Sequence, residues 1–381
     1  MRAPLSWIKE YAALDADVTA REVAEKLIDV GLEVETVDEV SITGPLLVAR
    51  VLEIEELTEF KKPIRYCQVD IGDSVRGVIC GATNFAAGDL VVAALPGTVL
   101  PGGFEIAARK TYGHISDGML CSGRELGIND EYDGILVLTE GEVGSDARPV
   151  LGLDDAVLDI AVTPDRGYCL SIRGIAREAA LAFGVGFTDP ADLVPDFPAE
   201  GTTQPVDLRE GADRFTARVV TGIDPAATSP ASMARRLTQC GMRPVSLAVD
   251  ITNYVMLELG QPLHAFDADK LRGAIQIRHP QPGETLETLD HVKRTLDEAD
   301  VVIADDRGAV GLAGVMGGLT TEIDDDSTNV VLEAAHFGAA DIAGMSRRHK
   351  LSSEASRRFE RGVDSNLALV ASNRAAQLLA E

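Results

Sequence analysis

Residues 46–138 contain five short apolar runs, which read LLVARVLEI (46–54), YCQVDI (66–71), GVIC (77–80), LVVAAL (90–95) and GILVL (134–138). Glycine, proline and aspartate separate these runs, and such clusters are typical of turns between β-strands. Five short strands in this space predict a small closed barrel. Barrels of this kind are often OB-folds, which use a strand face and its loops to hold oligonucleotides. The fold alone does not establish that function.

The segments around the barrel predict an α+β protein with several domains. A chain of 381 residues exceeds what one hydrophobic core usually organises, at roughly 100–200 residues per domain. We predict a small N-terminal helical unit at 1–39 and the OB-type β-barrel domain at 40–150. A connecting strand, helix and linker follow at 151–207, and then a mixed α/β domain at 208–381. That domain runs into a helix that still continues at the last residue, so we expect it to be truncated.

The composition is that of a globular protein, with 45% hydrophobic and 25% charged residues. No apolar run approaches the roughly 20 residues that cross a bilayer, and no signal peptide is visible. The five cysteines are widely spaced and never form a C-x-x-C pair, which favours reduced thiols and argues against a zinc site. We therefore expect a cytoplasmic protein with no membrane partner and no metal site in this chain.

The net charge of −26 argues against a protein that coats nucleic acid by bulk electrostatics, and we expect no DNA partner. Residues 347–361 are the exception, and we call their basic side chains the basic island. This segment contains six basic and two acidic residues, which give it a net charge of +4. The basic residues are Arg347, Arg348, Lys350, Arg357, Arg358 and Arg361. A solvated helix face is the commoner role of such a run, and a local RNA contact is the alternative.

Common catalytic strings such as G-x-S-x-G and H-E-x-x-H are absent from the sequence. The glycine-rich run GLAGVMGG (311–318) could hold an oxyanion with its backbone amides, or could simply be a tight turn. His264 lies between turn formers in QPLHAFD, where a structural histidine is the commoner outcome. Glu333 interrupts the apolar run NVVLEAA, so it needs either an ion-pair partner or a ligand that its carboxyl group binds.

Several segments together resemble the beta subunit of bacterial phenylalanyl-tRNA synthetase. They lie in the same order along nearly the whole chain, and their joint occurrence is very specific. The segments are LSWIKEY, GLEVE, ICGATNF, SDGMLCSGRELGI, VTPDRGYCLSIRGIARE, DITNYVMLELGQPLHAFD, LAGVMGG, VLEAAHF and SSEASRRFERGVD.

The resemblance implies a tRNA-binding OB-type domain near 40–150 and an editing domain near 210–381. The family's complete subunit is about twice this length, and the resemblance implies tRNA(Phe) and an alpha subunit as partners in an alpha2 beta2 tetramer. Synthesis belongs to the alpha subunit, so this chain is expected to edit but not to aminoacylate. It needs no cofactor of its own, whereas ATP and magnesium serve the full enzyme. A non-catalytic tRNA-binding or scaffold fragment is the alternative.

Carried over by motif, the resemblance implies an editing pocket that hydrolyses Tyr-tRNA(Phe). Its catalytic residues are His264 and Asn253, which would orient water at the ester, and no metal or nucleophilic serine is required because the ester is already activated. Its substrate-binding residues are Glu333, Gly314, Gly317, Ser353 and Ala355. Glu333 would accept the tyrosine hydroxyl, and the amides near 314–317 would stabilise the oxyanion. The family often has threonine where this chain has Ser353.

Overall fold

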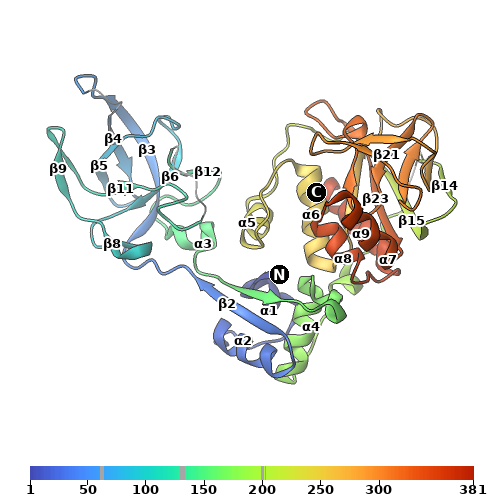
Figure 1. Cartoon of the computed structure of the whole chain (residues 1–381). Coiled ribbons are helices and arrows are strands. Elements are labelled where there is room, and N and C mark those ends of the chain that lie inside the picture. The colour runs from blue at the N-terminus through green and yellow to red at the C-terminus, as the bar shows by residue number, and fades with distance from the viewer. Residues whose placement is uncertain (61–63, 129–133, 199–200, 202) are drawn as a thin grey trace. The chain divides into compact units, whose positions relative to one another are not determined.

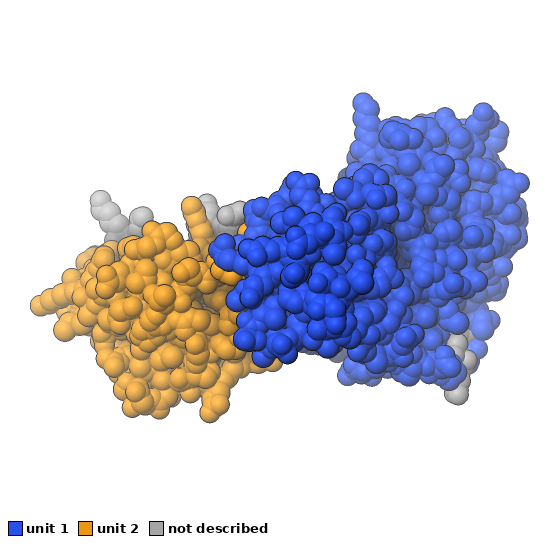
Figure 2. All heavy atoms as spheres, turned by 90° about the horizontal axis from the view of Figure 1, so that it is seen from below, with its two compact units in different colours: residues 1–37, 157–381 blue, residues 38–156 orange. Residues whose placement is uncertain are grey.

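The computed structural model describes residues 1–60, 64–128, 134–198, 201 and 203–381. The chain forms two compact units, one of residues 38–156 and one that combines residues 1–37 with 157–381 (Figure 2). None of the helices in these described ranges is long and apolar enough to cross a membrane.

The unit of residues 38–156 is an antiparallel, nearly closed barrel of the OB type, as the sequence predicted. Its sheet has the order β11-β6-β3-β4-β5, with β12 beside β6. These strands are β3 (Leu46–Glu56), β4 (Arg65–Asp70), β5 (Val75–Cys80), β6 (Leu90–Ala94), β11 (Met119–Leu120) and β12 (Val137–Leu138). Alternate residues such as Cys67, Val69 and Val78 point into the barrel core, as the two-residue period of a strand requires.

Two short hairpins and a helix complete this unit. They are β7 (Val99–Leu100) with β8 (Phe104–Glu105), β9 (Arg109–Thr111) with β10 (His114–Ser116), and α3 (Ala147–Leu151).

The second unit begins with a layer of helices and a three-stranded sheet, β1-β13-β2, to which both of its segments contribute. Its elements are β1 (Arg2–Pro4), α1 (Leu5–Tyr11), α2 (Ala20–Asp29), β2 (Glu33–Glu39), β13 (Ala156–Ala161) and α4 (Ile172–Phe183). Helix α2 starts at a capping box, in which the Thr19 side chain accepts from the Glu22 amide and the Glu22 carboxylate accepts from the Thr19 amide. Of the predicted linker within 151–207, residues 199, 200 and 202 lie outside the described residues.

Two packed sheets with helices on one side make up the rest of this unit (Figure 1). The first sheet, β15-β23-β16, consists of β15 (Ala212–Thr221), β23 (Asn329–Phe337) and β16 (Leu263–Asp267). The second has the order β14-β17-β20-β21-β22, with β14 (Val206–Leu208), β17 (Ile275–Arg278), β20 (Val302–Asp305), β21 (Gly308–Leu312) and β22 (Met316–Gly317). A hairpin of β18 (Thr285–Glu287) and β19 (Lys293–Thr295) lies beside them.

The helices of this region are α5 (Ala231–Gln239), α6 (Leu247–Leu259), α7 (Ala339–His349), α8 (Glu354–Phe359) and α9 (Leu367–Ala380). Helix α9 contacts β23 and β15, and α6 contacts β16. Strand β23 is apolar along most of its length because both faces are covered. Val331, Ala335 and Phe337 belong to the core shared with the second sheet, so Glu333, which has the same parity, points into that core as well.

Candidate functional site

The pairing of β16 with β23 places His264 directly opposite Glu333. Residues opposite each other on antiparallel strands project to the same face, and Cβ atoms there lie about 5 Å apart. On this face, Phe266 belongs to the core between the two sheets, and its ring meets the imidazole of His264 edge-on at a centroid distance of 4.5 Å. Two polar side chains that are far apart in the sequence therefore share one apolar environment.

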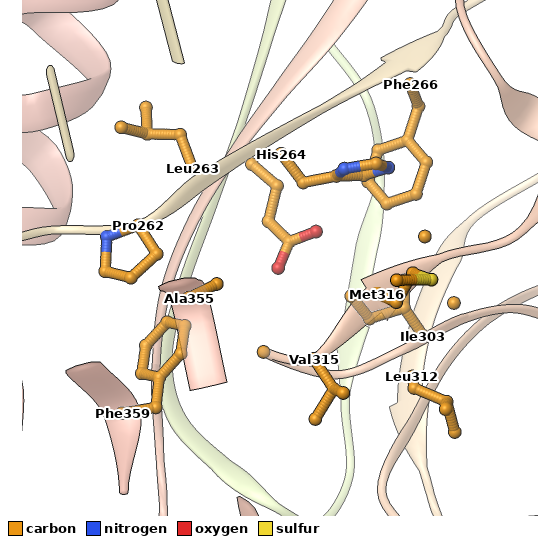
Figure 3. Close-up of a pocket in the computed structure, with 14 residues that line it drawn as sticks. Pro262, Leu263, His264, Phe266, Ile303, Leu312, Val315, Met316, Ala355 and Phe359 are labelled. Carbon is orange, nitrogen blue, oxygen red and sulfur yellow. The ribbon is translucent and has the colours of Figure 1, made fainter. Parts of the chain in front are cut away.

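A cavity of about 70 Å³ lies at this point (Figure 3). Its lining comprises Pro262, Leu263, His264, Phe266, Ile303, Gly311, Leu312, Gly314, Val315, Met316, Gly317, Glu333, Ala355 and Phe359. A water needs roughly 10–15 Å³, whereas a cavity of about 150 Å³ accommodates benzene. The pocket therefore has room for water as it stands and must widen to hold an aromatic ring. Half-buried Met316 is the unbranched lining side chain best suited to move.

Glu333 and His264 lack the partners that buried polar groups normally have. Glu333 is only 5% exposed, and neither its Oε2 nor the Nε2 of His264 has a hydrogen-bond partner among the described residues. Burial raises the pKa of Glu333 to about 8 and lowers the pKa of His264 to about 4. Both side chains are therefore predominantly neutral at pH 7. An unsatisfied buried group costs about 1–3 kcal/mol, so this arrangement is typical of a binding site.

The glycines of the 311–318 run shape one wall of the pocket. A Cβ atom on Gly317 would lie 2.5 Å from Cε1 of His264, so the imidazole packs directly on the backbone of β22. Gly314 has a φ of +64°, and a Cβ there would lie 2.8 Å from Cδ2 of Phe359. Glycine is therefore required at both positions, at one for the close approach and at the other for the left-handed backbone as well.

We expect Gly317→Ala to move the imidazole of His264 and to reduce the cavity, because the new methyl group occupies space that the ring now fills. A clash of this kind in a packed interior costs about 1–3 kcal/mol. Thermal unfolding measures that cost, and a crystal structure of the variant shows the ring position. Gly186→Ala is the control, since neither Gly186 nor Gly317 has a left-handed φ, and a Cβ at Gly186 would make only an ordinary contact with Cβ of Ala13 at 3.9 Å. An unmoved imidazole in Gly317→Ala would contradict the packing described above.

The other predicted site residues lie at different distances from this pocket. Ala355, in α8, lines it. Ser353 does not; it caps α8 by accepting from the Ser356 amide, and its hydroxyl donates to the carbonyl of Val315 at 2.7 Å. Ser353 thereby ties α8 to the glycine-rich run. Asn253 lines a neighbouring cavity of about 330 Å³, which shares Leu263 and His264 with the pocket.

Sequence reasoning missed most of the apolar lining. Phe266, Met316 and Phe359 line the pocket but belong to no polar motif. Phe266 stands two residues after His264 in β16 and so shares its face, but the sequence analysis placed this segment between turn formers and predicted no strand there.

For Arg358 the structure contradicts both interpretations of the basic island, the solvated helix face and the local RNA contact. Arg358 is 1% exposed and donates to the carbonyl of Leu170 and to the carboxylate of Glu354. It therefore links α8 to the segment at Leu170 inside this unit. Arg348 forms an ion pair with Asp300 at 2.6 Å.

Among the remaining members, Arg361 donates to the carbonyl of Val162, and Arg357 pairs with Glu354. Arg347 and Lys350 are exposed. Contact with tRNA stays a prediction for every member of the island except Arg358.

Comparison with known proteins identifies two domain families in the chain. Residues 211–381 match the B3/4 domain family, and residues 46–146 match the tRNA binding domain family. The phenylalanine–tRNA ligase beta subunit of Thermobifida fusca is 61% identical over 100% of this chain and 47% of its own length. That of Streptomyces avermitilis is 58% identical with the same coverage. The chain thus spans about half the length of the curated relatives that it matches.

Among solved structures, an N-terminal fragment of the phenylalanyl-tRNA synthetase beta subunit from Pyrococcus horikoshii matches with a TM-score of 0.29. It is 13% identical and covers 51% of this chain and 62% of that chain.

Proposed function

Because the chain belongs to the phenylalanine–tRNA ligase beta subunits, we propose that its pocket at Glu333 and His264 hydrolyses Tyr-tRNA(Phe). The observation that carries this proposal is the buried carboxyl of Glu333 in an apolar cavity, with an Oε2 that has no hydrogen-bond partner among the described residues. The full enzyme would charge tRNA(Phe) with phenylalanine, using ATP and magnesium, and this chain would contribute proofreading and tRNA binding. An alpha subunit would carry the synthetic site in an alpha2 beta2 assembly.

A second site is needed because tyrosine differs from phenylalanine by one hydroxyl group. An apolar pocket built for phenylalanine rejects an isostere with an added hydroxyl by only roughly 10²-fold. The reverse selection is easier, since a site that hydrogen-bonds the hydroxyl discriminates strongly against a ligand that lacks it. Glu333 supplies such a group, and the apolar lining around it fits an aromatic ring once the pocket widens.

His264 suits a role at the ester bond. Its lowered pKa keeps the imidazole neutral above about pH 4, so Nε2 can accept a proton or a hydrogen bond from water throughout the physiological range. The backbone at Gly317 lies against this ring, and we propose that peptide groups of the glycine-rich run stabilise the oxyanion that forms at the ester carbonyl. Asn253, in the adjoining cavity, would orient the ester or the attacking water from the other side of His264.

The test is incubation of the purified chain with Tyr-tRNA(Phe) and with Phe-tRNA(Phe), measuring release of each amino acid. We expect tyrosine to be released faster than phenylalanine and faster than by spontaneous hydrolysis, and His264→Ala to slow that release without changing the preference. ATP and phenylalanine should give no charged tRNA with this chain alone. Equal release from both esters, unaffected by His264→Ala, would favour the scaffold alternative.

A further inference from the structure

The barrel unit contains a groove that the proposed hydrolysis does not use. Along one stretch, β5 is bridged to the segment that follows β10, because the Asp117 amide donates to the carbonyl of Gly77 at 2.8 Å. The Ile79 amide likewise donates to the hydroxyl of Ser116 at 3.0 Å. β5 ends at Cys80, and a groove of about 900 Å³ is lined by residues 79–83 and by residues between 119 and 125.

Two motifs from the sequence analysis meet in this groove. ICGATNF contributes residues 79–83, and SDGMLCSGRELGI contributes Met119, Leu120, Ser122, Arg124 and Glu125. Leu100, Pro101 and Phe104 come from the β7–β8 hairpin. The lining combines apolar side chains with backbone groups, the Arg124 guanidinium, and the Ser122 hydroxyl bound to the Glu125 carboxylate, and nucleotide sites use such mixed linings.

The exposure of Phe104 indicates which kind of ligand the groove binds. It is 51% exposed, although a phenylalanine in a globular protein is usually buried. The guanidinium of Arg109 lies over its ring, 5.9 Å from the centroid, so one face has a cation and the ring remains open to solvent elsewhere. An exposed aromatic ring next to arginine is a platform on which an unpaired base stacks.

Resting on the tRNA binding proposed for this chain, we propose that this groove holds an unpaired RNA nucleotide, with its base stacked on Phe104. OB-folds bind oligonucleotides with a strand face and its loops, and the barrel unit matches the tRNA binding domain family. The chain is strongly acidic, with a net charge of −26, so stacking contributes more here than contacts with many phosphates. Single-stranded segments of a tRNA expose such bases, whereas a duplex hides their faces.

The test uses the full chain and a fluorescein-labelled adenosine oligoribonucleotide of about eight nucleotides, within the roughly 4–16 that one OB-fold covers. We expect Phe104→Ala to weaken binding roughly 5- to 150-fold, and Phe104→Trp to retain it. The salt dependence of binding should stay the same in both variants, because the ring contacts no phosphate. An RNA duplex of equal length should bind much more weakly than the single strand.

Tyr112→Ala is the matched control. Tyr112 is also an exposed aromatic residue of this unit, at 40%, but it does not line the groove. Circular dichroism of each variant checks that the barrel is folded. The proposal is overturned if Phe104→Ala binds like the wild type, if Tyr112→Ala causes the larger loss, or if duplex and single strand bind equally. Hydrolysis of Tyr-tRNA(Phe) by Phe104→Ala, measured at saturating tRNA, separates this groove from the pocket at Glu333.

Discussion

Replacement of Glu333 by alanine is expected to lower the preference of hydrolysis for the tyrosyl ester over the phenylalanyl ester by about 10- to 100-fold. Glu333 is the only residue of the pocket lining with a carboxyl group. In the variant, the tyrosine hydroxyl therefore loses that hydrogen-bond partner. Hydrolysis of the phenylalanyl ester should change little, because phenylalanine never made this bond. The measurement is kcat/KM for each ester, and the ratio gives the preference.

Glutamine at position 333 separates the hydrogen bond from the charge. At pH 7 the raised pKa keeps the wild-type carboxyl predominantly neutral, so Glu333→Gln, which also donates and accepts, should keep much of the preference. As pH rises through about 8, the wild-type carboxyl ionises and its bond to the hydroxyl becomes charge-assisted, so the wild-type preference should increase while that of Glu333→Gln stays level. If alanine leaves the preference intact, Glu333 does not recognise the hydroxyl.

Much of the fold follows from local sequence signals. The strand-like runs of residues 46–138 and their turns predicted the barrel, and Thr19 with Glu22 predicted the start of a helix that the structure confirms. Glu333 was also visible as a candidate, because a carboxylate in an apolar strand contradicts its surroundings. Each of these signals spans only a few neighbouring residues, so it can be recognised without knowledge of the tertiary contacts.

Other features depend on contacts between distant segments. The register that sets His264 opposite Glu333 depends on how β16 pairs with β23, and it cannot be predicted from either strand alone. Arg358 occurs in a charged run that is typical of a surface helix, yet its guanidinium reaches the carbonyl of Leu170 and is buried. The joining of residues 1–37 with 157–381 in one unit is likewise a tertiary result that no window of sequence predicts.

The pocket should also make the stability of the chain depend on pH at both ends of the range. Glu333 has an ordinary pKa of 4.5 and a folded pKa of about 8. Between these values the unfolded chain has lost a proton that the folded chain keeps, so the free energy of unfolding falls as pH rises from about 4.5 to about 8. The total loss is on the order of 5 kcal/mol. His264 acts at the acid end, since its folded pKa of about 4 is below its ordinary 6.5, and stability is lost as pH falls through that interval.

Glu333→Gln removes the first of these losses and keeps the shape of the side chain. The variant should match the wild type near pH 4.5 and become the more stable protein as pH rises, with the difference reaching its limit, on the order of 5 kcal/mol, above about pH 8. Urea unfolding at several pH values measures this, with Glu287→Gln on the exposed side of β18 as the control. A difference that does not vary with pH would show that the carboxyl ionises normally. A difference that grows with pH as expected would show that Glu333 costs the fold stability at neutral pH, which supports its proposed role in recognising the tyrosine hydroxyl.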